Sequence, residues 1–175
     1  MFAPESRLEP KIYVACLASY NAGILHGKWI DVTRDLKLIW IDIKAMLKAS
    51  PEPDAEEWAI HDYEGFGDLS LSEYESIEHV HALGEFIDEQ EEMGAALLAH
   101  YGGDLEESKA ALENFLGTYE SLEDYARELT EETSKIPDHL AYYINYEAMA
   151  RDMEMNGEVS TIRESYNRVH VFANQ

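Results

Sequence analysis

Residues 12–32 read IYVACLASYNAGILHGKWIDV, and this stretch decides how the N-terminal third of the chain folds. Residues 12–18 are apolar and β-branched, as in a strand that is partly buried. Residues 20–23 (YNAG) supply turn chemistry, and residues 25–32 have the composition of a second strand. The stretch therefore predicts an antiparallel β-hairpin with a loop longer than two residues.

A helix and a third strand are expected to follow the hairpin. Residues 35–49 carry apolar side chains at helical spacing, and two prolines at residues 51–53 prevent the helix from continuing. Residues 57–64 are typical of a third strand. We therefore expect an N-terminal α+β domain over residues 11–72. Residues 1–10 contain two prolines and no periodicity, so they are expected to form a flexible extension.

The pattern becomes helical after this domain. Ser72 with Glu75 fits a capping box, and the apolar residues that follow repeat at helical spacing. Further short helices are expected over residues 91–101 and 104–114, separated by a Gly-Gly pair whose backbone freedom suits a tight link. The sequence therefore predicts a central, acidic, helical domain over residues 73–113.

The last part of the chain mixes strand and helix signals, and we expect a C-terminal α+β domain over residues 114–175. Its expected elements are a strand at 115–120, a helix at 121–133, a helix at 146–155 ended by an Asn-Gly pair, and a hairpin formed by residues 159–162 and 169–172. No segment repeats at a fixed period, which disfavours solenoid folds.

The charge of the chain is large and unevenly placed. The formal net charge is −23; residues 1–50 hold 7 basic and 5 acidic residues, whereas residues 51–175 hold 6 basic and 31 acidic residues. Between Lys48 and Lys109 there is no lysine or arginine, yet 18 aspartates and glutamates occur. Blocks of like charge are often disordered, but this one is interleaved with enough apolar residues to fold. A folded anionic surface of this kind excludes direct binding to nucleic acid or to an anionic membrane and suits a partner that grips a polyanion.

The sequence shows no targeting or membrane signal. Residues 1–10 lack a cationic start followed by an apolar run, and charges interrupt the most apolar stretch at residues 36–47, so neither a signal peptide nor a membrane-spanning helix is expected. Cys16 is the only cysteine, which rules out an intrachain disulfide and fits a reducing compartment. We expect a cytoplasmic protein.

No motif predicts catalysis, a metal site or a cofactor. Walker A, GxSxG, dinucleotide-binding and EF-hand patterns are absent from the sequence, as are HExxH and CxxC pairs. His79 and His81 are two residues apart and would lie on different faces of a helix. A metal-dependent hydrolase that uses His61, Asp62 and His100 stays open as an alternative. An acidic module that sequesters some other basic nucleic-acid-binding protein is a second alternative.

The density of the negative charge favours a substitute for DNA. Carboxylates three or four residues apart on a helix lie roughly 5–6 Å apart at Cβ. Duplex DNA carries about one charge per ~1.7 Å of axis, so a charge of −23 corresponds to about 40 Å of duplex. The carboxylates expected to stand in for phosphates are Asp62, Glu64, Glu73, Glu75, Glu78, Glu85, Asp88, Glu89, Glu92, Asp104, Glu106 and Glu107.

Four segments resemble the ArdA antirestriction proteins of bacteria and their mobile elements. They are LASYNAGILHGKWI (residues 17–30), EWAIHDYEGF (57–66), SLEDYARELTEE (121–132) and YYINYEAMARD (142–152). The likeness covers nearly everything after residue 10. Within the first segment, Tyr20-Asn21, Gly23, His26-Gly27 and Trp29 are expected to hold the hairpin rather than to touch a partner.

The resemblance implies an elongated protein of three small domains that dimerises through its C-terminal domain. It also implies a non-catalytic imitation of bent duplex DNA that occupies the DNA-binding groove of type I restriction-modification enzymes. For the contact between the two subunits we expect Tyr142, Tyr143, Ile144 and Tyr146, with packing into the core of one chain as the alternative for these residues.

Overall fold

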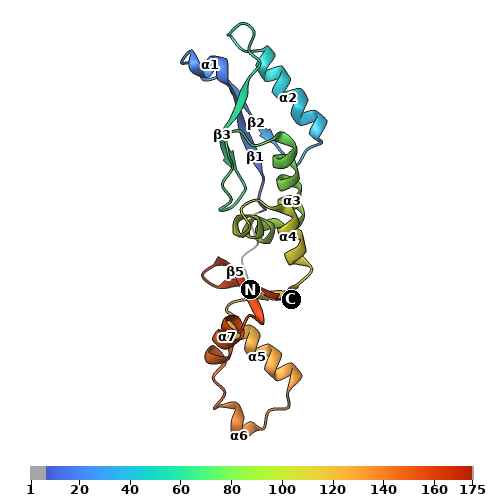
Figure 1. Ribbon diagram of the computed structural model, residues 1–175, viewed down its shortest axis with the longest axis vertical. Helices are drawn as coiled ribbons and strands as arrows, with labels where there is room; N and C mark the ends of the chain where they lie inside the picture. The colour runs from blue at the N-terminus through green and yellow to red at the C-terminus, as the bar shows by residue number, and fades with distance from the viewer. Residues whose placement is uncertain (1–6, 175) are drawn as a thin grey trace. The chain divides into compact units, whose positions relative to one another are not determined.

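The computed structural model describes residues 7–174, which divide into two compact units (Figure 1). The first unit ends at Leu105 and the second begins at Glu106. Over the described range the chain forms seven α-helices and two three-stranded antiparallel sheets, which confirms the mixed α+β class. The division into three domains, with boundaries near residues 72 and 113, stays a prediction.

The elements of the first unit run in the order that the sequence predicts, with one added helix. They are β1 (Lys11–Cys16), α1 (Leu17–Asn21), β2 (Gly27–Asp31), α2 (Leu36–Lys48), β3 (Trp58–Glu64) and α3 (Ile77–His100). Helix α4 begins at Leu105, the boundary between the two units, and the rest of it belongs to the second unit with all later elements. These elements are α4 (Leu105–Leu112), β4 (Phe115–Tyr119), α5 (Leu122–Thr133), α6 (Asp138–Ala141), α7 (Tyr146–Met155), β5 (Val159–Ser165) and β6 (Arg168–Ala173). Among the helices that the structure describes, none has both the length and the apolar composition needed to cross a membrane.

The first sheet has the strand order β2-β1-β3, with β1 in the centre. One of its faces carries Ile12, Val14 and Ile30, all of which are buried. Helix α2 covers this face, since Lys28, the cross-strand neighbour of Val14, forms a 3.3 Å ion pair with Asp42 of α2. The apolar alternation of the two hairpin strands thus builds the main core of the unit.

The loop of the hairpin differs from the prediction. Strand β1 ends at Cys16 instead of Ala18, because the next five residues form the short helix α1. The backbone N–H of Cys16 donates to the carbonyl of His26 at 2.9 Å, and Ser19 of α1 is buried with its hydroxyl 2.8 Å from that of Ser50. The predicted turn residues therefore end a helical turn rather than joining the two strands directly.

Helix α3 starts later than the capping-box pattern predicts. Its N-cap is Ser76, whose hydroxyl accepts a hydrogen bond from the backbone N–H of His79 at 3.2 Å. The hydroxyl of Ser72 instead accepts from the backbone N–H of Tyr74 within the preceding loop. The capping box at Ser72 and Glu75 was therefore wrong, because the cap forms next to Ile77, the first buried residue of the helix.

The predicted start of a new helix near residue 91 corresponds to a kink inside α3. Glu91 has φ 55° and ψ −136°, which is non-helical, so α3 consists of two helical segments joined at this residue. Each segment buries its own apolar side chains, including Ile87 before the kink and Leu98 after it.

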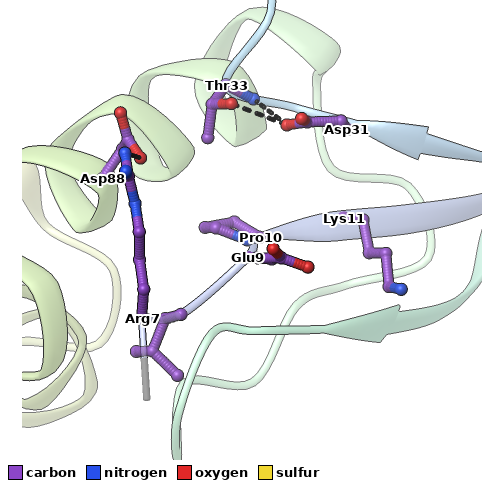
Figure 2. A pocket seen from close by; sticks show the side chains of 8 residues that line it. Arg7, Glu9, Pro10, Lys11, Asp31, Thr33 and Asp88 are labelled. Atoms are coloured by element: carbon purple, nitrogen blue, oxygen red, sulfur yellow. Dashed lines mark hydrogen bonds and ion pairs between the residues drawn. The ribbon is translucent and has the colours of Figure 1, made fainter. Parts of the chain in front are cut away.

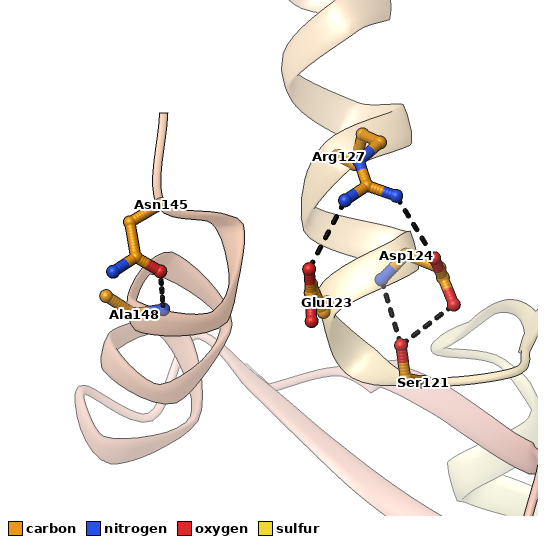
Figure 3. A network of polar contacts seen from close by, with 6 residues as sticks. All are labelled: Ser121, Glu123, Asp124, Arg127, Asn145 and Ala148. Carbon is orange, nitrogen blue, oxygen red and sulfur yellow. Dashed lines mark hydrogen bonds and ion pairs between the residues drawn. The ribbon is translucent and has the colours of Figure 1, made fainter. Parts of the chain in front are cut away.

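The second unit packs α5 and α7 together with a sheet of strand order β4-β6-β5. Its core contains Tyr125, Ala126, Ala150, Met153, Val159, Val169 and Val171. Helix α7 has the predicted bounds, and α5 begins one residue after its predicted start, since Ser121 is its N-cap. Figure 3 shows both caps: the Ser121 hydroxyl accepts from the backbone N–H of Asp124 at 3.2 Å, and the Asn145 side chain accepts from that of Ala148 at 3.0 Å.

The stability of the second unit is expected to fall at alkaline pH because of Tyr119. Burial, together with a hydrogen bond to the Glu128 carboxylate, raises the pKa of this phenol from 10.0 to about 12. A pKa that is higher in the folded state favours folding while the phenol is neutral. This contribution, on the order of 1–2 kcal/mol, is present below about pH 10 and lost between about pH 10 and pH 12.

Thermal unfolding followed by circular dichroism from pH 8 to pH 12 checks this expectation. The variant Tyr119→Phe should lose less stability across the alkaline range than the wild type. Tyr166→Phe is the matched control, because Tyr166 is 94% exposed. Equal alkaline slopes for Tyr119→Phe and the wild type would contradict the role assigned to Tyr119.

Candidate partner-binding surface

None of the twelve carboxylates that the sequence singles out is buried. Nine are exposed, and Glu75, Asp88 and Glu92 are half-buried. Ten belong to the first unit, while Glu106 and Glu107 belong to the second. The charge is thus displayed to solvent rather than used inside the fold, as a binding role requires.

Two of these carboxylates share one face of the first sheet. Asp62 and Glu64 lie two residues apart on β3, so their side chains project to the same side. Their direct neighbours on β1 are Tyr13 and Lys11, respectively. The Lys11 ammonium lies 3.2 Å from the Glu64 carboxylate. This is the side of the sheet opposite the core.

The first segment of α3 carries a row of glutamates. Glu78, Glu85 and Glu89 are spaced by seven and four residues, which places them along one side of the helix, and all three are exposed. The other side of the segment buries its apolar residues, Ile77, Val80, Leu83 and Ile87 among them. Glu92 lies after the kink at Glu91, so it does not continue this row along the same side of the helix.

Several of the carboxylates already contact a cation or a donor of their own chain. The guanidinium of Arg7 lies 2.6 Å from the carboxylate of Asp88, and Figure 2 shows the two side chains side by side. Two histidines of α3 contact glutamates, and the ring of His81 lies 3.3 Å from the carboxylate of Glu85. The indole N–H of Trp40 donates to Glu78 at 3.2 Å. Exposed pairs of this kind contribute about 0–1 kcal/mol, so a partner's cations can replace them at small cost.

The segment before β1 continues the central strand at the end of the first sheet. Of the extension predicted for residues 1–10, residues 1–6 lie outside the described part of the chain. In the remainder Pro10 is buried, and its carbonyl accepts from the backbone N–H of Val32 at 3.2 Å. This segment lines a cleft of about 330 Å³ together with Asp31, Thr33 and Asp88 (Figure 2). Because Arg7 and Lys11 also line it, the cleft mixes both signs of charge, unlike the glutamate row of α3.

The histidines proposed for a metal site have other neighbours. The ring of His61 packs edge-on against Tyr20 at 4.7 Å between centroids, and the ring of His100 packs against Tyr101 at 4.8 Å. Within residues 7–174, no group of three or more His, Cys, Asp or Glu side chains is arranged to hold a metal ion. The structure therefore adds no support for the metal-dependent alternative.

The four residues expected at the subunit contact separate into two kinds. Tyr142 and Tyr143 are 91% and 79% exposed, and Ile144 is half-buried. Tyr146 is only 8% exposed, and the guanidinium of Arg127 lies 5.1 Å from its ring centroid. Tyr146 is therefore packed within one chain, as the alternative reading expected, because α7 places its side chain against α5.

The sequence missed a pair of aromatic residues on the outer face of the first sheet. Tyr13 and Trp29 are direct cross-strand neighbours with ring centroids 5.6 Å apart, and Trp29 is 39% exposed. Trp29 was expected to stabilise the hairpin by packing, but a large part of its side chain remains exposed to solvent. The alternation of β1, in which Lys11 and Tyr13 oppose the buried Ile12 and Val14, is the signal that could have placed Tyr13 outside.

Comparison with known protein families finds a match over most of the chain. The model of the family described as antirestriction protein (ArdA) matches residues 12–168. No curated protein sequence matches the chain. The matched region covers most of both units and contains all twelve carboxylates that the sequence singles out.

Proposed function

The chain belongs to the ArdA family of antirestriction proteins, and from this premise we propose that it is a non-catalytic mimic of duplex DNA that inhibits type I restriction-modification enzymes. Its exposed carboxylates occupy the DNA-binding groove in place of phosphates. Cleavage of DNA is blocked because the groove is filled. Any methylation that requires DNA in the same groove is blocked in the same way.

The observation that carries the proposal is a folded surface with one sign of charge. The 60 residues from Ala49 to Ser108 contain 18 carboxylates and no lysine or arginine. They nevertheless form a strand and two segments of helix with buried apolar sides, and the carboxylates singled out remain at the surface. A basic groove that binds DNA through counterion release meets a comparable set of anions on this surface.

We also propose that the active form is a homodimer in the bacterial cytoplasm. Tyr142 and Tyr143 support this proposal, because two exposed tyrosines next to the 48% exposed Leu140 form an apolar patch that a subunit contact would cover. Analytical ultracentrifugation of the wild type and of a Tyr142→Ser, Tyr143→Ser double variant tests the dimer. The double variant should sediment as a monomer at concentrations where the wild type is dimeric.

A DNA-cleavage assay with a purified type I restriction enzyme tests the inhibition. The chain should inhibit cleavage, and its half-inhibitory concentration should rise at least about tenfold between about 50 and 200 mM salt, because ion pairs and counterion release weaken with salt. Added non-cleavable duplex DNA should displace the chain from the enzyme. Absence of inhibition, or inhibition without displacement by DNA, would contradict the proposal.

A further inference from the structure

The outer face of the first sheet is a small, regular grid of side chains. The pairing of the strands aligns Trp29, Tyr13 and Asp62 in one row across β2, β1 and β3. The next row contains Asp31, Lys11 and Glu64. Direct neighbours in antiparallel strands project to the same side, so all six side chains share this face. An aromatic pair is therefore flanked by carboxylates on both edge strands.

The grid already holds a cation of its own chain. The Lys11 ammonium lies 5.7 Å from the ring centroid of Trp29 and 3.2 Å from the carboxylate of Glu64. A cation over an aromatic face and against a carboxylate is stabilised by both groups. Because Lys11 itself is 40% exposed at its side chain, this internal contact is weak and open to exchange.

The backbone makes room for the aromatic pair. A Cβ atom at Gly27 would lie 2.7 Å from the ring of Tyr13 and 2.5 Å from the carbonyl oxygen of Val14. The ring of Tyr13 thus lies over a glycine, which keeps it close to the sheet and beside Trp29. Helix α2 covers the opposite face of the sheet through the Lys28–Asp42 ion pair. The aromatic pair is therefore fixed in position but left accessible.

We propose that this face of the sheet binds arginine side chains of the DNA-binding groove, with Trp29 and Tyr13 as the stacking surface and Asp62 and Glu64 as the carboxylate partners. The inference rests on the proposed function and adds an anchor to it. Arginine fits better than lysine, because its planar guanidinium can stack on an aromatic ring while it donates to a carboxylate. The anchor gives the complex a localised contact in addition to the many weak ones made by the carboxylates.

Inhibition of the type I enzyme by variants at Trp29 tests the anchor. Trp29→Ala should raise the half-inhibitory concentration about tenfold, whereas Trp29→Phe should stay within about twofold of the wild type. Tyr166→Ala, which removes an exposed aromatic ring from the second unit, is the matched control and should leave inhibition unchanged. If Trp29→Ala does not fold, Trp29→Thr replaces it, because threonine suits an edge strand.

A binding experiment without the enzyme separates the anchor from the proposed function. Ten-residue peptides of arginine and of lysine are titrated against the wild type, the Trp29→Ala variant and the Lys11→Met variant. The wild type should prefer the arginine peptide at least about threefold, Trp29→Ala should lose this preference, and Lys11→Met should bind the arginine peptide more tightly.

Two results would overturn the anchor. One is a folded Trp29→Ala or Trp29→Thr protein that inhibits as well as the wild type. The other is a wild type that binds both peptides equally. A wild type that shows the arginine preference but fails to inhibit the type I enzyme would contradict the proposed function and leave the arginine-binding face intact.

Discussion

Replacing Glu78, Glu85, Glu89 and Glu92 together by glutamine is expected to weaken inhibition of a type I restriction enzyme by about a hundredfold. Each exposed ion pair contributes about 0.7 kcal/mol, and about 1.4 kcal/mol corresponds to a factor of ten, so four pairs correspond to about two factors of ten. Glutamine keeps the length of the side chain and removes only the charge. Half-inhibitory concentrations measured at low salt give the effect most directly, because salt screens the same interactions.

A second quadruple variant controls for total charge. Glu120, Glu131, Glu132 and Glu147 are exposed carboxylates of the second unit that lie outside the predicted set. Changing these four to glutamine alters the net charge by the same amount, yet it should weaken inhibition by less than about tenfold. Equal losses in the two quadruple variants would show that total charge, rather than the position of these glutamates on α3, determines binding.

Single neutralisations should have small effects. Glu89→Gln is expected to change the half-inhibitory concentration by about threefold at most, because the energy is divided among many weak contacts. A folded Glu89→Gln protein that no longer inhibits would be incompatible with a surface of this kind. Trp29→Ala is expected to have a larger effect than Glu89→Gln, since a stacked guanidinium concentrates more binding energy on one side chain than an exposed ion pair does.

The sequence predicted most elements because their local signals agree with their burial. Helix α7 has the predicted bounds of residues 146–155, where an Asn cap precedes the helix and an Asn-Gly pair ends it. Strand β3 begins one residue after its predicted start. In both elements the apolar pattern and the end signals point to the same boundaries, so tertiary contacts did not need to decide between alternatives.

The start of α3 and the loop of the first hairpin could not be predicted, because contacts distant in sequence decide them. Both Ser72 and Ser76 can cap a helix, and the burial of Ile77 favours Ser76. Helix α1 forms where Ser19 packs beside Ser50, more than thirty residues away. Neither contact leaves a periodic signal in the sequence.

The candidate surface was predicted in its charge but not in its aromatic part. Charged carboxylates are rarely buried without a partner, so the twelve carboxylates of the surface could be named without a structure. The position of Trp29 depends on which face of β2 points away from α2, and the pairing register with β1 decides that. For Tyr146, the sequence left open whether the ring is buried, because its place in the core requires the neighbouring α5.

The N-terminal segment is held against the first sheet through Gly65, and Gly65→Ala is expected to destabilise the first unit by about 3 kcal/mol. Gly65 has φ +80°, which costs a residue with a side chain about 1 kcal/mol. In addition, its Cβ would lie 2.3 Å from the carbonyl oxygen of Glu9 and 2.7 Å from the backbone nitrogen of Pro10. Because these are backbone atoms, the segment must move, which breaks the hydrogen bond between Val32 and Pro10.

The variant Gly23→Ala separates the cost of the positive φ from the cost of the steric clash with the N-terminal segment. Gly23 has φ +79°, almost the same as Gly65, but a Cβ there would meet nothing within 4 Å, so this variant should lose only about 1 kcal/mol. Urea unfolding followed by tryptophan fluorescence reports on the first unit alone, because Trp29, Trp40 and Trp58 all belong to it. A loss in Gly65→Ala no larger than that in Gly23→Ala would mean that the packing of the N-terminal segment against Gly65 does not stabilise the first unit.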